Sequence, residues 1–153
     1  MNTPQRKFVV VLVLGIAVCS AYLLATASPW LLVEPVRSSG FPLGTLVAWA
    51  GIASLPTASL LGFHQFLSRQ ARLARASRTL MIVLLVLCAC WGFVSYALAG
   101  NWAFNFSDQS DSFQGSVAAS ELFRAYSLSI VVMTLLASAA IFAMALFSNR
   151  KSD

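Results

Sequence analysis

The sequence has few charged residues. Only 10% of its 153 residues are Asp, Glu, Lys or Arg, and 59% are hydrophobic. Soluble domains have about 25% charged and about 45–50% apolar residues. A single soluble core cannot hide this much apolar surface, so a lipid bilayer is the expected solvent. The composition therefore predicts an all-α integral membrane protein.

Ionisable groups are missing from the middle of every long apolar segment. Proton relays and ion-coupled transporters require such groups inside the membrane, so this absence argues against a proton-coupled antiporter. His64 is the only histidine, whereas a dihaem bundle needs paired axial ligands. No plausible acid, base, nucleophile or metal cluster lies within the apolar segments. We therefore expect no enzymatic activity, no cofactor and no bound metal.

Cysteines are also few, and none lies outside an apolar segment. The three are Cys19, Cys88 and Cys90. This placement argues against a secreted disulfide framework. Cys88 and Cys90 are about 200° apart around a helix and lack the C-x-x-C spacing of redox motifs. We interpret both as small packing residues.

Four long apolar segments are present, and each has about the twenty residues that a helix needs to cross roughly 30 Å of hydrocarbon. They predict one membrane domain over residues 1–153. The first segment ends on Ala25-Thr26-Ala27, which matches a signal-peptidase site. Cleavage is disfavoured because the apolar run exceeds the usual 7–15 residues or so. The predicted spans are residues 8–27, 42–63, 80–99 and 124–147.

Small residues in the second span are spaced four apart, which lets a neighbouring helix approach closely. The pairs are Gly44 with Ala48, Ala50 with Ser54, and Ala58 with Gly62. Gly100 and Asn101 end the third span.

Basic residues gather on one side of the predicted spans, and acidic residues on the other. The positive-inside bias then predicts four transmembrane helices in two antiparallel hairpins, with both termini in the cytoplasm. The central loop, residues 64–79, is cytoplasmic, and the loops 28–41 and 100–123 lie outside. The eight basic residues assigned to the cytoplasm are Arg6, Lys7, Arg69, Arg72, Arg75, Arg78, Arg150 and Lys151.

On a helical wheel, the arginines of the central loop cover one half of the circumference. This pattern predicts an amphipathic helix that lies at the interface or extends the second span. Their expected role is topological anchoring and contact with lipid phosphates. No motif that reads DNA or RNA accompanies them, so no nucleic-acid partner is expected. These residues are Arg69, Arg72, Arg75 and Arg78.

The loop over residues 100–123 combines aromatic and acidic residues. One interpretation is an interfacial belt, or a lid that folds back on the bundle. The other is a surface that binds a protein partner, because a loop this long tends to be functional. No EF-hand pattern accompanies the acids, so they are interpreted as surface charges. The predicted partner-binding residues are Trp102, Phe104, Phe106, Asp108, Asp111 and Phe113.

In layout, the chain resembles the four-span immunity proteins that protect bacteria from pore-forming bacteriocins or injected toxins. The similarity covers architecture and no motif. It implies a small inner-membrane protein that acts without catalysis through protein–protein contacts, as an immunity factor or as an accessory subunit of a membrane complex. The alternative is a small oligomeric transporter or channel subunit without intramembrane ion coupling. A homo-oligomer is compatible with both.

Overall fold

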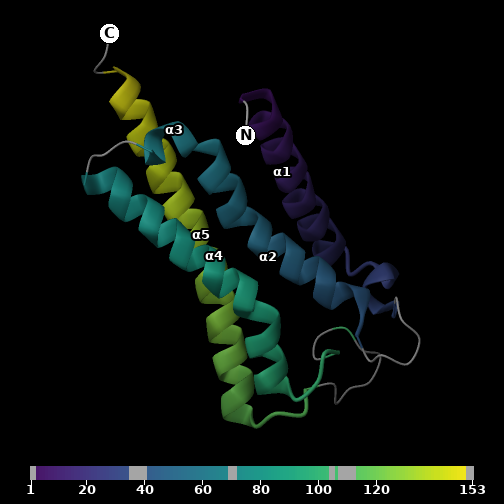
Figure 1. The fold of residues 1–153 in the computed structure, drawn as a ribbon. Helices are drawn as coiled ribbons and strands as arrows, with labels where there is room; N and C mark the ends of the chain where they lie inside the picture. Colours follow the sequence, from purple (N-terminus) through teal and green to yellow (C-terminus); the bar gives the residue numbers. More distant parts are fainter. Residues whose placement is uncertain (1–2, 35–40, 69–71, 104–105, 107–112, 151–153) are drawn as a thin grey trace.

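The part of the chain that the structure describes folds into helices (Figure 1). The computed structural model describes residues 3–34, 41–68, 72–103, 106 and 113–150, and no strand occurs among them. The helices are α1 (Thr3–Ala25), the 3-10 helix η1 (Pro29–Leu32), α2 (Leu43–Gly62), the single turn α3 (His64–Leu67), α4 (Arg72–Ala99) and α5 (Val117–Arg150).

Four of these helices, α1, α2, α4 and α5, are long and apolar enough to cross a membrane. Their most apolar stretches reach mean hydropathies of 2.7, 1.4, 2.3 and 2.5 in that order. Each helix contains most of one predicted span. The predictions of an all-helical protein and of four membrane-length helices are therefore confirmed.

Helix α2 lies between α1 on one side and the pair formed by α4 and α5 on the other (Figure 1). Helix α1 packs on α2 and contributes a single buried residue, Ser20. The two buried hydrophobic clusters therefore form without α1. One contains Ala48, Cys88, Trp91, Ala99, Phe123 and Ile130, and the other contains Leu67, Met81, Leu84, Ala137 and Ile141.

The contact between α1 and α2 depends on a glycine. A Cβ atom built on Gly51 would lie 2.6 Å from Cβ of Ser20, so only glycine allows this approach. Gly51 was not among the small residues singled out from the sequence. Of those that were, Gly44, Ala48, Ser54 and Ala58 are buried, whereas Ala50 and Gly62 are exposed.

Hydroxyl groups join α2 to α5. Oγ of Ser59 lies 2.6 Å from Oγ of Ser138, and Ser138 lies 2.7 Å from the carbonyl oxygen of Thr134. Ser59 also lies 3.1 Å from the carbonyl oxygen of Leu55. Two hydroxyls have only two protons for these three contacts. Either hydroxyl can donate in the contact between Ser59 and Ser138, and each also has a backbone carbonyl of its own helix within reach.

A residue with positive φ follows the end of two helices, α1 and α4. At the end of α1, the amide of Ser28 donates to the carbonyl of Leu23, and the amide of Ala27 donates to that of Leu24. This is a Schellman motif, but its left-handed position is held by Ala27 at φ 45 rather than by glycine. Helix α4 ends at Ala99 and is followed by Gly100, φ 79, whose amide donates to the carbonyl of Tyr96. The helix thus stops at the residue where the sequence places the end of the third span, and the position of the membrane boundary stays a prediction.

The central basic segment does not extend the second span. Helix α2 ends at Gly62, and the arginines from Arg72 onward belong to the first turns of α4. Helix α4 thus begins eight residues before the predicted span at Leu80. Arginine and alanine are good helix formers, so the helix continues where the apolar sequence does not. Helix α5 likewise begins at Val117, before the predicted span at 124.

Candidate functional site

Trp102 is the third residue after the end of α4, and its ring contacts a group of other aromatic rings. Its ring stacks on that of Tyr96 with centroids 4.6 Å apart, and it meets Phe41 edge-on at 4.9 Å. The ring of Phe93 lies 6.3 Å away. Aromatic pairs at these separations attract one another beyond the effect of buried area. We call Phe41, Phe93, Tyr96 and Trp102 the Trp102 cluster.

The backbone beneath the Trp102 cluster is fixed. The hydroxyl of Thr45, which is fully buried in α2, donates to the carbonyl oxygen of Trp102 over 2.7 Å. Above this anchor the rings stay accessible, since Phe93 is 63% exposed and Tyr96 is 42% exposed. The cluster therefore presents two accessible rings beside a backbone carbonyl that α2 holds in place.

Trp49 connects the cluster to the helix core. Its ring meets that of Phe93 edge-on with centroids 5.1 Å apart. Its indole N–H points at α4, 3.1 Å from the carbonyl oxygen of Cys88 and 3.0 Å from that of Ala89. Trp49 belongs to α2, so the same side chain contacts both the Trp102 cluster and the backbone of α4.

Two other aromatic residues of the loop between α4 and α5 pack against helices. Phe106 contacts Gly44, and its amide donates to the carbonyl of Ala103 over 3.0 Å. The ring of Phe113 lies 6.1 Å from that of Phe123. Both side chains are half-buried, as is Trp102. These contacts correspond to the lid interpretation, and partner binding by these residues stays a prediction.

The remaining predicted partner residues, Phe104, Asp108 and Asp111, lie outside the described residues. Sequence reasoning missed three members of the Trp102 cluster, namely Phe41, Phe93 and Tyr96. Their signal was an aromatic residue near the end of a span, where membrane interfaces favour Trp and Tyr. That signal indicates how deep in the membrane an aromatic ring lies, but not which rings contact one another.

Three of the four predicted lipid-contacting arginines lie on one exposed side of α4. Arg72, Arg75 and Arg78 are exposed, whereas Ala74 and Ser77 between them are buried. Leu73 between them is also 57% exposed, so the exposed side carries both charged and apolar residues, and an amphipathic helix at the interface stays a prediction. Arg69 lies outside the described residues, and contact of the arginines with lipid phosphates stays a prediction.

His64 connects the beginning of α1 to α3. Nη1 of Arg6 donates to Nδ1 of His64 over 3.2 Å, and Oγ of Ser68 lies 3.4 Å from the same nitrogen. The basic start of the chain and the connection between α2 and α4 therefore lie at the same end of the bundle. In the described part of the chain, no group of three or more His, Cys, Asp or Glu side chains could hold a metal ion.

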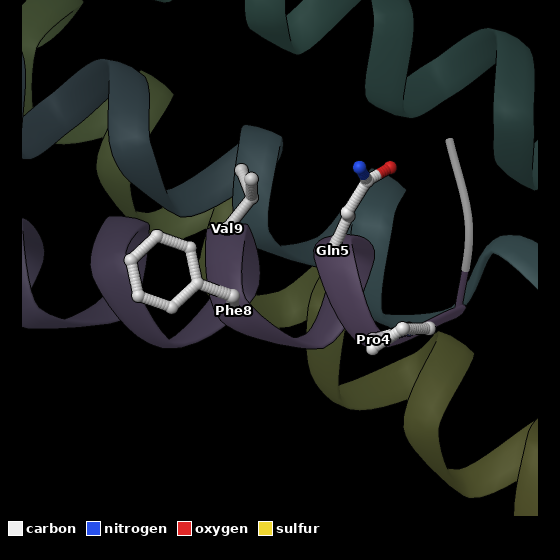
Figure 2. Close-up of a pocket in the computed structure, with 4 residues that line it drawn as sticks. All are labelled: Pro4, Gln5, Phe8 and Val9. Carbon is white, nitrogen blue, oxygen red and sulfur yellow. The ribbon is translucent and has the colours of Figure 1, made fainter.

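A shallow hollow lies at the beginning of α1. Figure 2 shows its four lining residues, all from the first turns of that helix, with Gln5 and Val9 projecting to the same side. Phe8 is 70% exposed. Since the hollow is bordered by one helix and its side chains do not converge, it lacks the enclosed shape of a ligand site.

Comparison of the chain with protein-family models, with curated proteins and with solved structures finds no match.

Proposed function

We propose that this is a small polytopic protein of a bacterial inner membrane that acts without catalysis, through protein–protein contacts. It would serve as an immunity factor against a membrane-active toxin or as an accessory subunit of a membrane complex. The observation that supports this proposal is the Trp102 cluster. The exposed rings of Phe93 and Tyr96 project from α4 and contact Trp102, whose carbonyl is held by Thr45, so little conformational freedom is lost when a partner covers them.

We also propose that the helices form two antiparallel hairpins with both termini in the cytoplasm. The charge asymmetry of the sequence supports this orientation. The bond between Arg6 and His64 supports it independently, because it joins the two basic regions at one end of the bundle. In this orientation the Trp102 cluster lies at the outer surface, where an incoming toxin or an external domain of a partner has access.

Site-specific photocrosslinking in living cells tests the proposed contact. A photoreactive phenylalanine analogue replaces Tyr96 in one variant. In the control variant it replaces Leu128, which is 67% exposed on α5. We expect a discrete protein adduct from position 96 and only lipid adducts from position 128. Lipid adducts alone from both positions would contradict the proposal.

A toxin challenge distinguishes the two proposed roles. Cells that carry the protein should survive a membrane-active toxin produced by related strains if it is an immunity factor. An accessory subunit would instead co-purify in a fixed ratio with its complex and give no protection. Solute flux through the purified protein in liposomes would contradict both roles and favour the oligomeric transporter.

A further inference from the structure

A groove runs between α1, α2 and α5. Helix α1 packs on α2, and residues of α1, α2 and α5 line the groove. The groove has a volume of about 320 Å³. Ala17 and Leu24 mark its extent on α1, Gly51 lies on α2, and Leu135 lies on α5.

The cross-section of the groove limits the width of a molecule that it can enclose. From Ala17 to Leu24 the axis of α1 advances about 10 Å at 1.5 Å per residue. Its volume of about 320 Å³ over that length corresponds to a cross-section of roughly 30 Å². An α-helix about 10 Å wide occupies roughly 80 Å². The groove is therefore too small to enclose a partner helix, which could only lie across its open side, and large enough to enclose one hydrocarbon chain.

Ser20 is the polar feature of this otherwise apolar groove. It is only 5% exposed and lies against Gly51. Within the described part of the chain, no atom makes a hydrogen bond with its hydroxyl. Ser20 lines the groove, and a hydroxyl that faces hydrocarbon without a hydrogen-bond partner is costly in a membrane. An oxygen on the occupant would supply the missing partner.

The depth of Ser20 restricts the occupant further. Gly51, which it contacts, follows the first residue of α2 by eight positions, about 12 Å along the axis. With α2 spanning the membrane, this level lies in the hydrocarbon region. A phosphate headgroup cannot leave the interface to reach it, because burying an unpaired charge there is prohibitive. The occupant's oxygen must be uncharged.

We propose that the groove between α1, α2 and α5 binds one neutral single-chain lipid, whose hydroxyl or carbonyl oxygen hydrogen-bonds to Ser20. The inference is independent of the proposed protein partner, because the Trp102 cluster does not line the groove.

Photolabelling of the purified full-length protein in liposomes tests this proposal. The probes are a long-chain alcohol and a long-chain alkane, each with a photoactivatable diazirine, and adducts are mapped by mass spectrometry. Ala21→Phe fills the groove from α1. Val18→Phe is the matched control, since Val18 is on the same helix, is 69% exposed and does not line the groove.

We expect the alcohol to label groove residues in the original protein and in Val18→Phe, and to lose most of that labelling in Ala21→Phe. Ser20→Ala should weaken labelling by the alcohol about fivefold, the worth of one hydrogen bond, and leave labelling by the alkane unchanged. Circular dichroism and gel filtration confirm that each variant is folded.

Three results would overturn the proposal. They are adducts spread evenly over α1, equal labelling by both probes regardless of Ser20, or a stoichiometric helical protein crosslinked within the groove.

Discussion

The indole ring of Trp49 lies directly on Gly92. A Cβ atom added at position 92 would fall 2.5 Å from the ring carbons of Trp49, closer than carbon atoms can pack. We therefore expect Gly92→Ala to destabilise the protein by about 1–3 kcal/mol, the usual effect of overpacking. Thermal unfolding in detergent, followed by tryptophan fluorescence, measures this change.

Gly15→Ala is the matched control for Gly92→Ala. Nothing lies within 4 Å of a Cβ added at Gly15, in the middle of α1. Alanine favours a helix interior over glycine by about 0.5–1 kcal/mol, so this variant should be neutral or more stable. Equal destabilisation by the two substitutions would show that Trp49 does not lie on Gly92.

Removing Trp102 should loosen the loop between α4 and α5. Trp102→Ala deletes ring contacts with Tyr96, Phe41 and Phe93, each worth about 0.5–1.5 kcal/mol beyond buried area. We expect a total loss of about 2 kcal/mol and faster proteolysis of the loop. Trp30→Ala should change stability by less than about 0.5 kcal/mol, since Trp30 is 67% exposed. A Trp102 variant as stable as the Trp30 variant would contradict the proposed anchoring.

The hydroxyl contact between α2 and α5 predicts energetic coupling between Ser59 and Ser138. A double-mutant cycle with Ser59→Ala and Ser138→Ala should give a coupling of about 0.6 kcal/mol, the average for such bonds in membranes. Unfolding in detergent measures the four species. Additive effects of the two substitutions would mean that the hydroxyls do not interact.

The left-handed residue at the end of α1 predicts opposite effects of two substitutions. Ala27 has φ 45, a conformation that costs a residue with a Cβ atom about 1–2 kcal/mol. Ala27→Gly should therefore stabilise the protein by about 0.5–1 kcal/mol, after allowance for the greater freedom of glycine in the unfolded chain. Ala27→Val should destabilise it, because β-branched residues tolerate positive φ poorly. Destabilisation by glycine would contradict the described end of α1.

The proposed orientation can be tested with single cysteines at Ala76 and Gln114, after replacement of the three native cysteines. Both positions are exposed, whereas Ala74 in the same part of α4 is 1% exposed and would react poorly. A membrane-impermeant thiol reagent should label Gln114→Cys in intact cells and Ala76→Cys only after permeabilisation. The reverse pattern would invert the topology.

The loop between α4 and α5 illustrates how far local signals reach. Its aromatic composition indicated a contact region, and Gly100 marked where α4 stops. Composition could not show that Trp102 meets Phe41, because the two residues are far apart in the chain and meet only when α2 packs on α4. The beginning of α4 was missed for another reason, since hydropathy reports the length of a span and not that of the helix containing it.

The sequence by itself determined the helical class and the four membrane-length helices, because their apolar length and turn residues are local properties. Only the tertiary structure decided which faces meet. These helices are apolar nearly all round, so no polar face sets their rotation. The choice depends on close packing, in which Ser20 fits on Gly51 and Trp49 fits on Gly92 because neither glycine has a Cβ atom.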